Sequence, residues 1–165
     1  NLGPAGATLV VLRPDMLERV PSGLPSMLDY SVQAKNGSMF NTPPCYTIYM
    51  LGLVFRHCLK LGGIEAITKI NEEKAAVLYD AIDGSGGFYR GHAVKENRSR
   101  MNVSFVLAND ELTKPFLAQA AAQGMLELNG HRSVGGCRAS IYNAMPKSAV
   151  ETLVAFMKDF QAKNG

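Results

Sequence analysis

Residues 130–146 form the stretch GHRSVGGCRASIYNAMP, in which a glycine-rich basic segment runs into a short apolar one. His131, Arg132 and Arg138 fall within eight residues, in a stretch that also contains the three glycines Gly130, Gly135 and Gly136. Glycine lets a backbone approach a ligand closely, and the planar guanidinium of arginine offers paired donors to a carboxylate or phosphate. The pattern indicates an anion-binding turn before a strand near residues 137–141. The alternative is a solvated basic turn in which Arg138 pairs with a carboxylate of the protein itself.

The sequence on both sides of this stretch predicts a small α/β unit. Helices are indicated by apolar residues at helical spacing, and strands by short runs between turn residues. The expected elements, in chain order, are a helix over 64–82, strands over 88–90 and 101–107, a helix over 110–123 capped by Asn109, strands over 125–128 and 137–141, and a helix over 147–163. This order suggests a sheet that helices cover mainly on one face.

The helix expected over residues 64–82 has an apolar stripe, and we place Glu72, Glu73 and Lys74 on its solvent side. The pair Gly62-Gly63 directly before it interrupts helical structure. We therefore place a domain boundary there, with residues 1–61 in one domain and 62–165 in another.

The first 61 residues carry weaker patterns. The run ATLVVL at residues 7–12 is almost wholly apolar and predicts a buried strand. A short helical turn is expected from Asp15, and residues 26–44 are expected to form a long irregular loop, a kind of segment that is often functional. A helix should begin at Pro43 and continue to about Leu61, because Thr42 is a suitable N-cap and proline is favoured at a first helical position.

Asn41 and Thr42 form a second candidate anion site at the start of that helix. The first backbone N–H groups of a helix lack partners and carry partial positive charge, so side-chain donors beside them favour an anion. The simpler interpretation is that Thr42 caps the helix and Asn41 makes a turn. The residues alone favour this simpler interpretation, since capping is the commoner role.

Composition and charge exclude several classes of protein. The chain has 165 residues and a net charge of +3, but its 17 basic residues are interleaved with 14 acidic ones and form no run, so we expect no nucleic-acid partner. Three widely spaced cysteines favour a reducing, cytoplasmic compartment. The longest apolar stretch, residues 48–55, is too short to cross a membrane. No phosphate-binding loop or metal-ligand spacing is present, and Arg98 and Arg100 are expected to be solvated.

Four stretches resemble the phosphoserine aminotransferases, pyridoxal-phosphate enzymes of the aspartate-aminotransferase fold type, also called fold type I. They are NLGPAG at residues 1–6, SMFNTPP at 38–44, NRSRMNV at 97–103 and the opening stretch at 130–146. The likeness covers essentially the whole chain. It implies that residues 1–61 end the large cofactor-binding domain and that residues 62–165 form the small C-terminal α/β domain.

The resemblance also implies roles for individual residues. The family carries its Schiff-base lysine immediately before the position of Asn1, so we expect the polypeptide to extend upstream and to contain that lysine. Asn41 and Thr42 would reach the cofactor phosphate of a partner subunit, which implies a homodimer with its active site at the interface. His131 and Arg132 would bind the substrate phosphate, and Arg138 the α-carboxylate.

The implied reaction is transamination with pyridoxal 5'-phosphate as the cofactor. Glutamate gives up its amino group, and 3-phosphohydroxypyruvate receives it to become phosphoserine, a step of serine biosynthesis. Two alternatives stay open: a non-catalytic module that binds a small phosphorylated acid, and another aminotransferase of fold type I. The combination of phosphate and carboxylate clamps in residues 130–146 argues against both.

Overall fold

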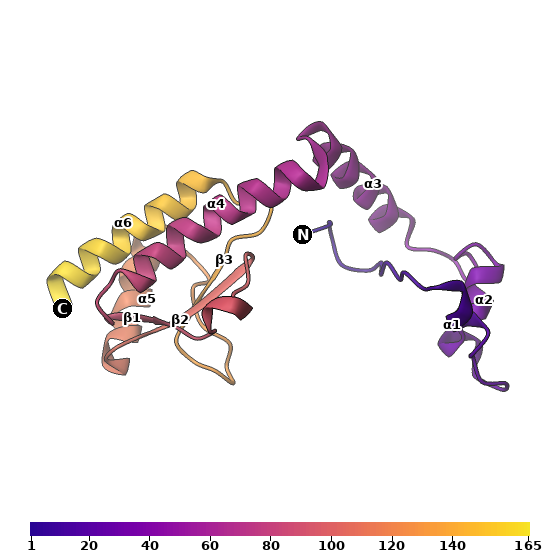
Figure 1. Cartoon of the computed structure of the whole chain (residues 1–165), viewed down its shortest axis with the longest axis horizontal. Coiled ribbons are helices and arrows are strands. Elements are labelled where there is room, and N and C mark those ends of the chain that lie inside the picture. Colours follow the sequence, from indigo (N-terminus) through magenta and orange to yellow (C-terminus); the bar gives the residue numbers. More distant parts are fainter. The chain divides into compact units, whose positions relative to one another are not determined.

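The computed structural model describes all 165 residues, which form two compact units (Figure 1). One unit is Leu2–His57, and the other consists of Asn1 together with Cys58–Gly165. The assignment of residues 1–61 to a cofactor-binding domain and of 62–165 to a small domain remains a prediction.

The Leu2–His57 unit is mainly loops and helices. Its elements are α1 (Pro14–Leu17), a 3-10 turn (Ser26–Leu28), α2 (Tyr30–Lys35) and α3 (Cys45–Lys60). The prediction of one irregular loop over residues 26–44 is therefore wrong in part. Asp29, whose side chain accepts the N–H of Ser31 at 2.7 Å, caps α2.

The buried strand predicted over residues 7–12 is wrong for this chain. The segment pairs with no other strand, and Leu9 and Val11 are 63% and 96% exposed. A strand needs a neighbour to receive its backbone hydrogen bonds, and this unit contains none. The apolar, β-branched composition of the segment predicts a strand, but composition does not determine whether a second strand is there to pair with it.

Helix α3 fixes the glycine-rich segment at the start of the chain. The hydroxyl of Thr47, a buried residue of α3, donates to the carbonyl of Ala5 at 3.3 Å. Gly6 has φ of 119°, and a Cβ added there would lie 3.1 Å from the Thr47 hydroxyl oxygen. Glycine at this position allows the segment to pass close to the helix.

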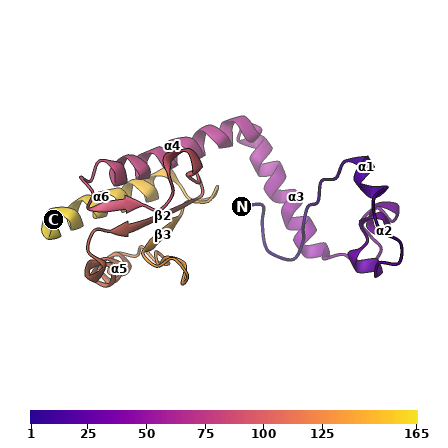
Figure 2. The same cartoon turned by 60° about the horizontal axis from the view of Figure 1, so that its bottom comes forward.

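The second unit is an α/β sandwich of helices on a three-stranded antiparallel sheet. Its helices are α4 (Gly63–Asp83), α5 (Thr113–Ala122) and α6 (Lys147–Asn164), and its strands are β1 (Tyr89–Gly91), β2 (Asn102–Leu107) and β3 (Cys137–Ser140). The strand order is β1-β2-β3. Helices α4 and α6 lie side by side over the sheet (Figures 1 and 2). Most of the predicted elements are present here, with ends that differ by at most three residues.

Alternation along the strands places the core on one face of the sheet. On β2, Val103, Phe105 and Leu107 are buried, and the residues between them are only partly buried. Phe116 of α5 is fully buried against four further aromatic rings, with centroids 5.0 to 6.0 Å away. Such tilted and edge-to-face contacts stabilise a core beyond simple burial. The prediction of a sheet covered mainly on one face is confirmed.

Two further predictions in this unit are wrong. Residues 125–128 form no strand; only Asn129 pairs with Cys137, because Glu127 has a positive φ of 58° that interrupts the extended backbone. Lys74, expected on the solvent side of α4, is fully buried.

No helix of the protein is both long enough and apolar enough to cross a membrane.

Candidate active site

The basic segment at residues 130–136 folds into a closed loop. The N–H of Gly130 donates to the carbonyl of Gly136 at 2.9 Å, and the N–H groups of Val134 and Gly135 both donate to the carbonyl of His131, at 2.8 and 2.7 Å. A Cβ at Gly130 would collide with the carbonyl of Gly135. The glycines are therefore required for the loop to close, whereas the sequence pattern suggests that they let the backbone approach a ligand.

The loop presents His131 and Arg132 to solvent. The Nδ1 atom of His131 lies 2.6 Å from the Ser133 hydroxyl oxygen and accepts the Ser133 N–H at 3.3 Å, so its Nε2 atom is free for another partner. Arg132 is exposed and belongs to none of the protein's ion pairs. The structure thus brings these two predicted residues together on one turn, and neither is engaged by a carboxylate.

Arg138 lies on β3, on the face of the sheet opposite the core. We call this the open face; it carries Ser104, which pairs with Arg138 across the strands, and Asn102, which pairs with Ser140. Arg138 is partly buried, and its Nε is buried without a hydrogen-bond partner. It forms no ion pair, so the alternative in which Arg138 pairs with a carboxylate of the protein is not observed. A buried, unpaired guanidinium N–H is costly and fits a ligand that supplies the acceptor.

A cavity of about 340 Å³ runs along β3 and includes Arg138 in its lining. Segments 124–128 and 138–141 and the beginning of α6 form its walls, which are largely apolar. The volume is within the range of small-molecule sites, in which a few polar groups orient the ligand. Arg138 and Glu127 are the charged residues of the lining.

Asn41 and Thr42 belong to the other unit and lie in the loop before α3. Both are exposed; the Asn41 side chain accepts from Gln33 Nε2 at 3.4 Å and donates to the Thr42 carbonyl at 3.3 Å. Helix α3 begins at Cys45, so its N-cap position is Pro44; Thr42 lies two residues too early, and the simpler interpretation of Thr42 is wrong. The helix is 16 residues long, and its free N–H groups can face an anion.

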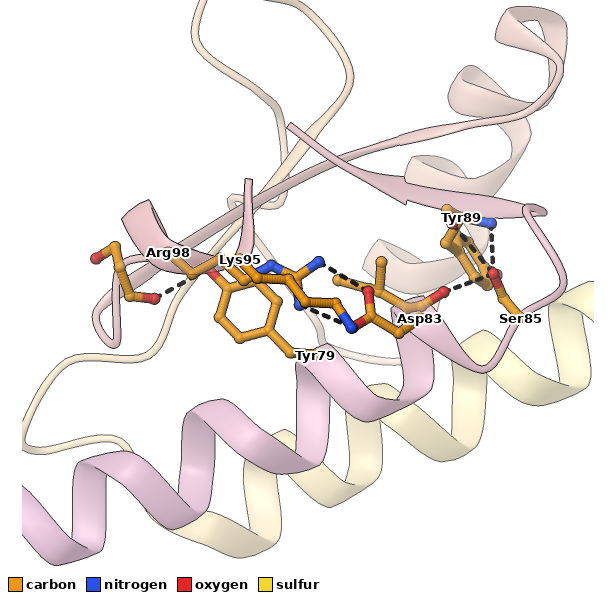
Figure 3. A network of polar contacts seen from close by, with 8 residues as sticks. Tyr79, Asp83, Ser85, Tyr89, Lys95 and Arg98 are labelled. Atoms are coloured by element: carbon orange, nitrogen blue, oxygen red, sulfur yellow. Dashed lines mark hydrogen bonds and ion pairs between the residues drawn. The ribbon is translucent and has the colours of Figure 1, made fainter. Parts of the chain in front are cut away.

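Arg98 is a structural residue, contrary to the expectation that it is solvated. Its guanidinium binds both carboxylate oxygens of Asp83, and Lys95 adds a longer contact to the same group at 3.5 Å (Figure 3). The hydrogen bonds from Arg98 hold the pKa of the Asp83 carboxyl below its usual value. Arg100 is also paired, with Glu72 at 2.8 Å. These arginines are occupied within the fold and offer no free anion site.

Sequence reasoning missed a polar cluster on α4. Lys74 donates to three backbone carbonyls beyond β3, and Asn71, one turn earlier, donates to Asn143. The signal was present, because Asn71 and Lys74 have the same helical spacing as the buried residues Ala75 and Leu78. No group of three or more metal-binding side chains is close enough together to hold an ion.

Comparison with known proteins places this arrangement in one family. Residues 1–153 match the family described as aminotransferase class-V. A phosphoserine aminotransferase of Geobacillus kaustophilus is 58% identical over 163 residues, which are 99% of this chain and 45% of the relative. The chain therefore spans less than half the length of that curated relative.

Solved structures of phosphoserine aminotransferases are also similar to this chain. A structure that describes radiation damage of the Schiff base in a phosphoserine aminotransferase is 53% identical, with a TM-score of 0.95 over 99% of this chain and 45% of that one. The PLP-bound phosphoserine aminotransferase from Trichomonas vaginalis is 40% identical, with a TM-score of 0.82 over 89% of this chain and 42% of its own.

Proposed function

Because this chain belongs to the class-V aminotransferases, we propose that the complete protein is a phosphoserine aminotransferase. In this proposal it moves an amino group from glutamate to 3-phosphohydroxypyruvate and releases 2-oxoglutarate and phosphoserine, as a step of serine biosynthesis. The observation that carries the proposal is the free, partly buried guanidinium of Arg138 on a strand that follows a loop with two further unpaired donors. The identity to phosphoserine aminotransferases over nearly the whole chain supports it.

The cofactor would be pyridoxal 5'-phosphate, which supplies an electron sink for the carbanion of the substrate when it is bound. Asn41 and Thr42 fit its phosphate, because their side chains are exposed beside the start of a 16-residue helix. The lysine that binds the cofactor would directly precede Asn1. In this proposal Asn41 and Thr42 serve the active site of the other subunit of a homodimer.

Arg138 would bind the α-carboxylate that both substrates share. Its position on β3 fixes the backbone from which the side chain extends, because Arg138 and Ser104 are paired in the sheet. A carboxylate would provide the acceptor that Nε lacks and would complete a bidentate pair. Arg138 therefore orients the substrate rather than taking part in proton transfer.

His131 and Arg132 would bind the substrate phosphate. A phosphate carries about −1.5 to −2 charges at pH 7, so it needs more than one donor. The free Nε2 of His131 and the unpaired Arg132 guanidinium lie on one short turn and meet that need. We further propose that the protein acts in the cytoplasm and has no nucleic-acid or membrane partner.

Reduction of the complete protein with borohydride, followed by peptide mass mapping, tests this proposal together with turnover. We expect the cofactor to be fixed to the residue that precedes Asn1, and we expect 3-phosphohydroxypyruvate to be aminated at the expense of glutamate. A protein that binds phosphorylated acids without amino transfer would instead be the non-catalytic module. Amination of other oxo acids, with 3-phosphohydroxypyruvate excluded, would indicate a different aminotransferase.

A further inference from the structure

Helix α4 holds the segment between β3 and α6, residues 141–145, through a buried ammonium group. We call this segment the 141–145 loop. Lys74 Nζ donates to the carbonyls of Tyr142 at 2.7 Å, Met145 at 3.0 Å and Ile141 at 3.3 Å. All three of its N–H donors are thus directed at the backbone of one loop, and none of the protein's ion pairs includes Lys74.

A second contact extends from the same face of α4 to the start of the chain. Asn71 Nδ2 donates to Asn143 Oδ1 at 2.8 Å, and the backbone N–H of Asn143 donates to Asn1 Oδ1 at 3.1 Å. Asn143 is therefore a link between Asn71, which is 5% exposed, and Asn1, which is exposed. Because Lys74 fixes the carbonyls on both sides of Asn143, this residue has little freedom to move.

Stability alone does not account for the polar residue Asn71 of α4. Asn71 Oδ1 is buried without a partner, and a leucine of similar size would avoid that loss of hydration. Burial lowers the pKa of Lys74, which reflects the cost of keeping a charge inside the fold. Replacing Lys74 with an apolar residue would leave its three carbonyl acceptors without a donor, so Lys74 stabilises the 141–145 loop and also sets the position of its backbone.

We propose that Asn71 and Lys74 are positioning residues, which hold the 141–145 loop so that Asn143 fixes Asn1 and, through it, the residue directly before Asn1. This inference rests on the proposed function, in which that residue is the cofactor-binding lysine. The residues of α4 touch neither substrate nor cofactor in this proposal. They act through Asn143 on the orientation of the reactive side chain.

The test uses the complete protein with cofactor and compares Asn143→Ala with Asn143→Asp, which keeps the oxygen that accepts from Asn71. We expect Asn143→Ala to lower kcat about tenfold, because small misplacements of a reacting group are costly, with KM for both substrates unchanged. The visible circular dichroism of the bound cofactor should weaken in the same variant. Asn143→Asp should restore both.

Ser85→Ala is the control for a merely structural effect. The Ser85 hydroxyl is buried in the same unit and bonds to Ile82 and Tyr89, so its loss should lower the melting temperature but leave kcat and the circular dichroism unchanged (Figure 3). Normal kcat and dichroism in Asn143→Ala, or equal damage in Asn143→Asp, would overturn the inference.

Failure of the proposed function would be distinguishable, because the unmodified protein would then show neither transfer nor a visible band. In that case hydrogen exchange of the residue 143 amide, which donates to Asn1, decides about the 141–145 loop: faster exchange in Asn143→Ala supports its hold on Asn1, and unchanged exchange contradicts it.

Discussion

Arg98 donates two hydrogen bonds to the carboxylate of Asp83, at 2.8 and 2.7 Å, and its guanidinium carbon lies 4.5 Å from the centre of the Tyr79 ring. Tyr79 and Asp83 are one turn apart on α4, and the Arg98 side chain is 15% exposed. A planar fork can bind a carboxylate and stack on a ring at the same time. Arg98 thus ties the turn before β2 to the end of α4.

Replacing Arg98 with lysine should lower the free energy of unfolding by about 1 to 2 kcal/mol, because an ammonium keeps the charge but loses the paired geometry and the stacking. Denaturant unfolding of the complete protein measures this difference. Arg100→Lys is the matched control, since Arg100 is 56% exposed and its pair with Glu72 is worth less than about 1 kcal/mol. Equal effects in the two variants would contradict the structural role of Arg98.

Cys137 should be unreactive in the folded protein and should make stability depend on pH. Burial raises the pKa of its thiol from 9.0 to about 12, so the folded state keeps a proton that the unfolded state loses. The stabilising contribution is complete below pH 9 and falls as pH rises towards 12, by at most about 1.4 kcal/mol per pH unit.

The measurement is the unfolding free energy between pH 9 and 10, a window below the ordinary pKa of tyrosine. Cys137→Ala should remove this part of the slope, although it also loses packing. With a thiol reagent at pH 8, exposed Cys45 should react first and Cys137 only on unfolding. Rapid labelling of Cys137 in the folded protein would contradict the assigned burial.

Local pattern predicted the elements whose partners lie nearby in the sequence. Helix α4 was predicted because its apolar residues repeat at helical spacing, and β2 because it leads from one turn into an alternating run. These signals depend only on which face of an element is covered. They are present in this chain even though it spans less than half the length of the curated relative.

The errors came from information that local pattern does not contain. Residues 7–12 have the composition of a strand but no neighbouring strand in their unit. Glu127 takes a left-handed conformation that no residue pattern in the sequence indicates. Lys74 was placed in solvent on charge alone, although its three carbonyl acceptors follow β3, far away in the chain. Of the candidate site, the loop with His131 and Arg132 was predicted, but the unpaired state of Arg138 required the structure.

Replacing Thr42 with valine tests its contact with the cofactor phosphate. The shape is kept and the hydroxyl donor is lost, so the dissociation constant of the cofactor should rise about tenfold, the value of a single hydrogen bond to a charged group. Thermal stability of the cofactor-free protein should not change, because Thr42 is exposed and does not cap α3. Thr42→Ser should restore affinity, and an unchanged dissociation constant in Thr42→Val would remove Thr42 from the site.

Arg138→Lys should impair both halves of the proposed reaction. Both substrates carry an α-carboxylate, and a lysine cannot reproduce the two parallel hydrogen bonds of the guanidinium. The loss is expected to be about 1.5 to 3 kcal/mol in substrate binding, or about ten- to a hundredfold. Single-turnover measurement with glutamate and with 3-phosphohydroxypyruvate gives the two values separately. Full activity of Arg138→Lys with either substrate would show that Arg138 does not hold the shared carboxylate.

Arg132→Ala should separate the two substrates. The phosphate of 3-phosphohydroxypyruvate carries about −1.5 to −2 charges at pH 7, whereas glutamate presents a single carboxylate at the corresponding end. Loss of Arg132, which is exposed and unpaired, leaves more of the phosphate charge uncompensated, so single-turnover rates should fall further for the phosphorylated substrate than for glutamate. The fold should be unaffected because Arg132 makes no ion pair that the variant would break. Lys158→Ala is the control for general charge, since Lys158 is an exposed residue of α6 that belongs to none of the ion pairs. Equal losses for both substrates in Arg132→Ala would mean that this residue does not distinguish phosphate from carboxylate.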